Sequence, residues 1–367
     1  MLNVSVIGIG NAGNQVAALA KQAGFSAMAL NSSDKDLSTV KSVVTTLIVG
    51  DEKGAGKDRN TAKAFIKESI REMLAEKYLD DVLVGQDVVA IVSSTGGGTG
   101  SGMAPMLQAI LSNMYPQTHF IVVGILPPVS ESLAGQQNSL EYLQEMKKTN
   151  PTYMLYDNGK HEKLGTVSMF HNVNNDIVED LKVIRGDYQI TTPYSSIDEK
   201  DSMKIYQTPG RLVVAKASGF REKDVDEQSI EQRLINAVKS GSQVELETDR
   251  KVKRLGLIVN LSQNIYETMD ATTPDIKKAF GEPIEGFEHI AISDQLESVA
   301  ALLMAGLNFP DDRIVRTMQK IEEVQSKLTA RKSSILDTIE TESIAEIRSD
   351  GEKSVPAMDL DDILSGY

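Results

Sequence analysis

The hydrophobic positions in the first half of the chain alternate between short runs and longer, spaced patterns. Six short runs rich in β-branched residues are each followed by a Gly, Asn, Asp or Pro turn, and helical patterns separate them. This alternation predicts a parallel sheet with helices on both faces. The predicted strands are Val4 to Ile7, Ala27 to Leu30, Val43 to Val49, Val88 to Ser93, Phe120 to Ile125 and Tyr153 to Tyr156. Open α/β sheets bind ligands at the carboxyl ends of such strands.

One long helix is predicted directly after this half. Its apolar residues recur every three or four positions, as one buried stripe requires, at Val167, Phe170, Val173, Ile177, Leu181 and Ile184. A polar loop, Thr191 to Asp201, follows it. Strand-like runs at Leu212 to Ala217, Gly256 to Leu261 and His289 to Ser293 then predict a smaller mixed domain with helices between the strands.

From Asp311 the pattern becomes that of a long polar helix. Its apolar residues keep the three-to-four spacing, at Ile314, Met318, Ile321, Val324, Leu328, Ile335 and Ile339. Charged Lys332 breaks the seam of a coiled coil, so we expect the helix to pack on its own domain. After about Ser349 the chain is acidic and punctuated by Gly and Pro, which predicts a flexible tail.

These patterns predict an α/β fold with five parts. A Rossmann-like parallel-sheet domain comes first, then a long central helix, a smaller α/β domain, a long C-terminal helix and an acidic tail. The predicted bounds are 1–165, 166–190, 191–310, 311–348 and 349–367.

Composition and charge narrow the classes of function. The chain has no cysteine, which excludes disulfides and thiolate metal sites. With 38 Lys and Arg against 52 Asp and Glu, broad direct contact with nucleic acid phosphates is disfavoured, and a link to DNA would need an adaptor. The chain enters its first strand without a basic segment, and it has no run of eighteen apolar residues. We therefore expect a cytoplasmic protein without a membrane span.

The first glycine loop, Gly8-Ile9-Gly10-Asn11-Ala12-Gly13, fits G-x-G-x-x-G between a strand and a helix. Backbone N–H groups and a helix N-terminus can hold phosphate in that context. The same motif could open a dinucleotide-binding domain, in which an Asp or Glu at the end of the second strand holds the ribose. Asn31 stands at that position here, followed by Ser32, Ser33 and Asp34. This weakens the reading of an NAD-dependent enzyme and leaves it open.

A second loop, Gly96 to Gly102, holds five glycines with Thr99 and Ser101. It lies between a buried strand and an amphipathic helix, where a flexible linker would not be expected, so phosphate binding is favoured. A third segment, Gly50 to Arg59, superficially suggests a Walker loop. That motif needs Gly and Ser or Thr where Asp51 and Asp58 stand, so we exclude a P-loop.

Together these loops resemble those of the tubulin/FtsZ superfamily. Gly96 to Gly102 matches the signature GGGTGSG at every position, and Gly10-Asn11-Ala12-Gly13-Asn14-Gln15 resembles GQxGNQ. The resemblance covers about Met1 to Ala345. It implies a GTPase that binds GTP or GDP with Mg²⁺ and assembles with itself into head-to-tail filaments. The first predicted domain, 1–165, would then bind GTP. The smaller α/β domain, 191–310, would be the activation domain.

The resemblance also implies which residues contact the nucleotide. Phosphate would lie against the first loop, the turn after the second strand, the third loop and the signature loop, and a turn after Ile125 would face the ribose. The implied residues are Gly10, Asn11, Ala12, Asn14, Gln15, Asn31, Gly54, Ala55, Gly56, Gly96, Gly97, Gly98, Thr99, Gly100, Ser101 and, for the ribose, Glu131.

Guanine would be read by Asn158, Phe170 and Asn174. An amide can both accept and donate hydrogen bonds at the guanine edge, and an aromatic ring offers stacking area. For Phe170, packing in the core is an equal alternative.

No histidine or lysine in the glycine loops is a candidate for a built-in base in hydrolysis. In the family, acidic residues for hydrolysis come from the next subunit, and the segment Ser196-Ile197-Asp198-Glu199-Lys200-Asp201 resembles the motif N-x-D-x-x-D. Asp198 and Asp201 take the carboxylate positions, and Ser196 replaces Asn. Such carboxylates can polarise and position a water in line with the γ-phosphate, while Mg²⁺ and backbone donors carry its charge.

The charge of the C-terminal tail helps to distinguish the branches of the superfamily. Residues Ser349 to Tyr367 contain five acids and one lysine, unlike an FtsZ tether or the basic end of a TubZ tail. We interpret the chain as similar to the phage and plasmid TubZ/PhuZ type, a filament that segregates or positions DNA. A DNA-binding adaptor would meet its C-terminal region. The alternatives are an FtsZ-like division filament and, from another class, an NAD-dependent Rossmann enzyme.

Overall fold

The computed structural model describes most of the chain. The described residues are 1–190, 192, 197–220, 229–246, 251–268, 277, 280–294 and 298–349, with side chains up to residue 330 in the last helix. Contacts divide the chain into one compact unit, Met1–Met318, and a second that begins at Gln319. In the described part, no helix is both long and apolar enough to cross a membrane.

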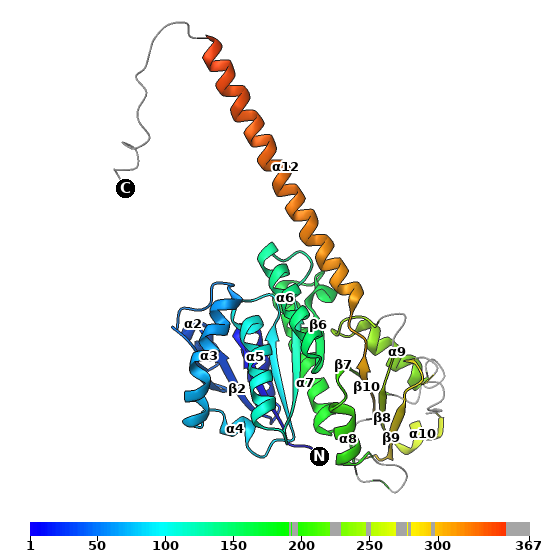
Figure 1. Ribbon diagram of the computed structural model, residues 1–367. Coiled ribbons are helices and arrows are strands. Elements are labelled where there is room, and N and C mark those ends of the chain that lie inside the picture. Colours follow the sequence, from blue (N-terminus) through cyan, green and yellow to red (C-terminus); the bar gives the residue numbers. More distant parts are fainter. Residues whose placement is uncertain are drawn as a thin grey trace. The chain divides into compact units, whose positions relative to one another are not determined.

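The first unit is built on a ten-stranded sheet with the order β3-β2-β1-β4-β5-β6-β7-β10-β8-β9 (Figure 1). The strands are β1 Val4–Ile9, β2 Ser26–Asn31, β3 Thr45–Ile48, β4 Val88–Ser94, β5 His119–Leu126, β6 Thr152–Asp157, β7 Gly210–Ser218, β8 Arg254–Leu261, β9 Glu285–Ile292 and β10 Val299–Leu307. The described pairings are parallel except those of β10 with β7 and β8. The predicted α/β class with a parallel sheet is confirmed.

Helices connect the strands. Their bounds are α1 Gly10–Gln22, α2 Asp34–Ser38, α3 Arg59–Ala75, α4 Asp80–Leu83, α5 Thr99–Met114, α6 Leu133–Thr149, the 3-10 turn η1 Asn158–His161, α7 Thr166–Arg185, α8 Glu199–Tyr206, α9 Ile230–Ser240, α10 Gln263–Thr268 and α12 Asp311–Ser349. The last helix crosses from the first unit into the second.

The sheet is buried on both faces because its strands are apolar at successive positions. In β1, Val4 and Val6 join a core that includes α1, α7 and α8, whereas Ile7 and Ile9 join a core that includes α3, α5 and α6. A third core lies where β7, β8 and β10 pack against α9. Between β6 and β7 only two residue pairs are in register, Thr152 with Gly210 and Tyr153 with Arg211. The predicted domain bounds inside this unit stay a prediction.

The two long helices differ from their predicted buried stripes. In α7, Val173, Ile177, Leu181 and Ile184 are buried, but Val167 is 83% exposed and Phe170 46% exposed. In the first turns of α12, Met318 is exposed and the buried residues are the polar Arg313 and Thr317. The stripe of α7 was therefore wrong at its N-terminal end, and that of α12 was wrong at Met318. In α12 the buried Arg313, Thr317 and Ile321 keep the helical spacing, so polar residues occupy part of the buried face.

The parallel strands place the loops at two opposite edges. The loops that follow β1, β2, β4, β5 and β6 meet at the carboxyl edge of the sheet. Helix α8 lies at the amino edge, beside the N-terminus, whose amino group is 3.5 Å from a carboxylate oxygen of Glu199 (Figure 1). Helix α7 connects the edges: it follows η1 at one end, and at the other its Arg185 carbonyl accepts a bond from Leu2 N.

Candidate nucleotide site

The two glycine loops come together as the N-termini of α1 and α5. Helix α1 begins at Gly10 and α5 at Thr99, and within the described residues no side chain caps the first turn of either. A Cβ on Gly10 would lie 3.0 Å from Gly100 N, so only glycine lets the loops approach this closely. Two uncapped helix N-termini side by side present several backbone N–H donors, and their dipoles favour an anion between them.

Two neighbouring glycines of the second loop have opposite surroundings. A Cβ on Gly98 would lie 2.8 Å from Lys57 Cα, so this glycine packs on the third loop. A Cβ on Gly97 would meet nothing within 4 Å. Gly97 therefore borders the open space of the cradle, and Gly98 forms part of its wall.

Buried amides hold the first loop in place. In the orientation that satisfies its neighbours, the Asn14 amide nitrogen donates to the carbonyls of Gly8 and Gly10, and its oxygen accepts from Asn31 at 2.9 Å. Both side chains are buried. The structure thus places Asn14 and Asn31 behind the cradle, where they shape the backbone, whereas Asn11 is exposed at its mouth. Gln15 donates to Thr39 Oγ1.

The third loop, Gly50 to Asp58, is fixed to the other two. Gly54 N donates to Ser32 O, and the Ser32 hydroxyl is 2.7 Å from that of Thr99. Ala55 is buried, and Gly56 has open space at its Cβ position. The structure therefore brings the predicted phosphate residues of all three loops to one place.

Two buried residues that the sequence did not indicate complete the cradle. The Asn138 amide on α6 donates to the carbonyls of Lys57, Gly96 and Gly97. Arg59, which is buried, donates to Ser101 O and pairs with Glu141 and Glu145. Arg59 ends the third segment and Asn138 lies in α6, and their role as supports follows from their contacts in the fold.

The predicted ribose residue lies across the mouth of the cradle. Glu131 Oε1 is 3.3 Å from Lys57 Nζ, and that ammonium also donates to Ser132 Oγ at 2.9 Å. The pKa of Glu131 is lowered, first by the bond it accepts from Ser132 N and then by Lys57. An ionised, partly exposed carboxylate there could accept from a sugar hydroxyl.

The predicted guanine residues lie where β6 ends. Asn158 is 9% exposed, and within the described structure its side-chain oxygen is buried without a hydrogen-bond partner. Such an orphaned acceptor costs free energy unless a ligand supplies a donor. Phe170 is too exposed for the core-packing alternative, so its ring is available for stacking. Asn174 is partly exposed one turn further along α7.

The predicted catalytic acids lie at the other edge. Asp198 caps α8, accepting from Asp201 N at 2.8 Å, and Asp201 is 3.2 Å from Lys204 Nζ. Ser196 lies outside the described residues. The strand β1 between the two edges has six residues, about 20 Å at the usual rise. Within one chain, the structure does not bring these acids to the cradle.

Comparisons with known proteins agree with this geometry. Residues 3–165 match the model of the Tubulin/FtsZ family, GTPase domain. The tubulin-like protein TubZ of Clostridium botulinum C phage is 29% identical over 160 residues, which span 42% of this chain and 44% of that protein. The tubulin-like protein CetZ of Thermococcus kodakarensis is 25% identical over 291 residues, 74% of either chain.

Solved structures show the same fold over nearly the whole chain. A GTPγS-form protofilament of Bacillus thuringiensis serovar israelensis TubZ superposes with a TM-score of 0.75 at 18% identity, covering 91% of this chain and 94% of that one. The C. botulinum phage c-st TubZ gives a TM-score of 0.71 at 20% identity, covering 89% and 98%. Residues 3–165 thus match the Tubulin/FtsZ GTPase domain, and the resemblance seen in the loops is confirmed.

Proposed function

Because residues 3–165 match the Tubulin/FtsZ GTPase domain, we propose that the protein is a GTPase whose active site is shared between stacked copies. Each copy holds GTP at the carboxyl edge of its sheet. The next copy in a head-to-tail filament brings Asp198 and Asp201 to the γ-phosphate. Hydrolysis then follows assembly.

The observation that carries this proposal is the separation of the two halves of the site. The glycine cradle and the acids of α8 lie at opposite edges of one sheet. A head-to-tail contact between copies places the amino edge of one against the carboxyl edge of the next. The B. thuringiensis TubZ with the same fold was solved as a protofilament, which supports this arrangement.

The chemistry assigns different roles to the two edges. The uncapped N-termini of α1 and α5 would hold the phosphates, with Mg²⁺ held mainly by phosphate oxygens and water. The carboxylates of Asp198 and Asp201 would orient the attacking water. Lys204 contacts Oδ1 of Asp201 at 3.2 Å, so among the described residues this ion pair leaves Oδ2 able to accept from that water.

Guanine selection is proposed for the turn after β6. The unpartnered oxygen of Asn158 would accept from the N–H groups of guanine, and adenine offers no donor at the corresponding ring nitrogen. Glu131 would hold the ribose after giving up its contact with Lys57. That ammonium would then be free to approach the phosphates.

For the cellular role we propose a cytoplasmic filament that segregates or positions plasmid or phage DNA. TubZ proteins are among the relatives by sequence and by fold, which supports this branch. The net charge of -14 favours an adaptor protein over direct contact with DNA and offers no attraction to an anionic membrane. Pyrococcus furiosus cell division protein FtsZ 1 is 26% identical over 254 residues, which keeps a division filament as the second candidate.

The dependence of turnover on protein concentration tests the shared site. Turnover per subunit should be near zero below a critical concentration and rise steeply above it, because isolated copies lack the acids. Phosphate release and light scattering, measured on the same samples, check this. A turnover per subunit that is constant from dilute to concentrated protein would reject the proposal.

A further inference from the structure

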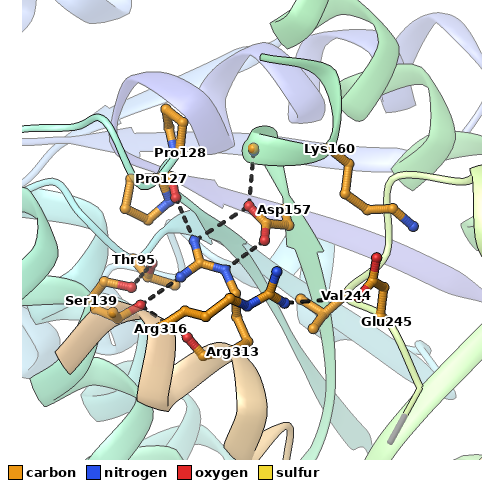
Figure 2. A network of polar contacts seen from close by, with 12 residues as sticks. Thr95, Pro127, Pro128, Ser139, Asp157, Lys160, Val244, Glu245, Arg313 and Arg316 are labelled. Carbon is orange, nitrogen blue, oxygen red and sulfur yellow. Dashed lines mark hydrogen bonds and ion pairs between the residues drawn. The ribbon is translucent and has the colours of Figure 1, made fainter. Parts of the chain in front are cut away.

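One arginine of α12 is buried against the carboxyl edge of the sheet. Arg313 lies in the first turn of the helix and is 2% exposed. Its guanidinium donates to Asp157 and to Pro127 O, as Figure 2 shows. It also donates to Thr317 Oγ1. Burying a guanidinium is costly unless its charge is paired and its donors are used. Because its N–H donors are used in this way, the guanidinium of Arg313 holds its partners in a fixed geometry.

The first partner carries the predicted base-reading turn. Arg313 Nε is 2.6 Å from Asp157 Oδ2, and the other oxygen of the same carboxylate accepts from Gly159 N at 2.8 Å. Asp157 is thus the cap of η1, whose first residue is Asn158. By orienting this carboxylate, Arg313 sets where the unpartnered oxygen of Asn158 lies.

The second partner begins the predicted ribose loop. Arg313 Nη2 donates to Pro127 O at 2.7 Å. The next carbonyl, that of Pro128, accepts from Glu131 N and from the Gln136 side chain. One planar guanidinium therefore ties together the loops after β5 and β6, a task that needs several donors in a fixed fork.

We propose that Arg313 is a positioning residue for the base and ribose end of the nucleotide site. The inference rests on the proposed function, because it assumes that Asn158 and Glu131 face a nucleotide. It adds that the first turn of α12 is part of the nucleotide-binding structure. The phosphate end has its own supports, Asn14 and Asn138, so loss of Arg313 should affect the two ends differently.

The test compares Arg313→Met with the unchanged protein below its assembly concentration. Calorimetry gives the Kd for GTP and for inorganic tripolyphosphate, which carries the phosphates without base or ribose. We expect the Kd for GTP to rise about tenfold, as for the loss of one or two well-placed hydrogen bonds. The Kd for tripolyphosphate should stay within about twofold, because the cradle keeps its own supports.

Arg211→Met is the matched control. Arg211 is also buried, at 1% exposure, and donates to the backbone carbonyls of Val244 and Glu245. It should lower the melting temperature without the selective loss for GTP. Arg313→Lys should recover part of the GTP affinity, since an ammonium can reach one of the two loops.

The outcomes separate the two proposals. Equal losses for GTP and tripolyphosphate, or the same pattern in Arg211→Met, would make Arg313 merely structural. If Arg313→Met does not fold, the Kd values for GTP and tripolyphosphate are measured for Asp157→Asn instead. An unchanged GTP affinity of Asp157→Asn overturns the inference. If the unchanged protein binds neither ligand, the proposed function fails.

Discussion

The carboxyl and amino edges of the sheet are built in contrasting ways. At the carboxyl edge the functional loops are fixed by buried groups, among them Asn14, Asn138 and Arg313. At the amino edge, Asp198 is exposed, and among the described residues Asp201 is held by contacts within its own helix and cap. The first edge is ready to receive a ligand by itself. The second is a surface whose acids lie far from the glycine cradle of the same chain.

This difference shows which edge of the sheet has to be preorganised before a ligand binds. Binding a polyanion needs donors fixed before the ligand arrives, and such fixing requires burial. In the proposed shared site the acids enter the site of a neighbouring copy, which requires them to lie on the surface. The comparison predicts that changes at the carboxyl edge weaken nucleotide binding, whereas changes at the amino edge spare binding and slow turnover.

Gly97→Val should have the largest effect. A Cβ at this position would meet no atom within 4 Å, so we expect a valine side chain to extend into the open space beside the α5 N-terminus. We expect the Kd for GTP to rise at least about a thousandfold, or about 4 kcal/mol, with little change in melting temperature. Filter binding and calorimetric unfolding check this.

Gly98→Val is the matched comparison, because its side chain would press on the backbone of Lys57. It should reduce both binding and stability. Normal GTP binding by Gly97→Val would mean that the phosphates lie elsewhere.

Asp201→Ala should come next in size. It should bind GTP and assemble normally but hydrolyse about a hundredfold more slowly or worse, as for loss of a group that orients the attacking water. Its filaments should persist, which time-resolved light scattering would show.

Glu199→Ala removes an exposed acid from the same helix and should turn over GTP normally. If both variants are equally slow, the effect belongs to the charge of the surface and not to Asp201.

The smallest predicted effect is on stability and concerns α7, the helix that connects the two edges of the sheet. Asp180 on α7 is buried and accepts from Tyr156 and Gln243, and burial raises its pKa to about 7. The folded state keeps this proton up to about pH 7, whereas an unfolded Asp loses it near 4, so stability falls as the pH rises between those values.

Asp180→Asn should therefore flatten the pH dependence of the unfolding free energy by up to about 1.4 kcal/mol per pH unit in that window. Urea unfolding at pH 5 and pH 8 measures it. If the unfolding free energy changes with pH equally in the unchanged protein and in Asp180→Asn, Asp180 is ionised throughout this pH range.

The glycine loops could be placed from the sequence at the carboxyl ends of their strands, because glycine loops between strands and helices leave a local signature, and their binding of phosphate stays a prediction. The hydrophobic pattern did not predict β10, whose run Val299 to Leu307 is apolar at every position and rich in Ala, Leu and Met. A strand buried on both faces has no alternation to recognise. Arg313 and Thr317 were missed for a related reason: they are polar residues buried by tertiary contact, which periodicity cannot detect.

The central claim, a site shared between copies, is tested most directly by mixing two inactive variants. Gly97→Val subunits cannot hold GTP but keep Asp198 and Asp201, whereas Asp201→Ala subunits hold GTP and lack one acid. Once co-pelleting shows that the two assemble together, GTP hydrolysis should reappear, at the contacts where an intact acidic loop meets a bound nucleotide. If the mixture co-assembles and remains as inactive as Asp201→Ala alone, each copy does not complete its neighbour's site and the account is contradicted.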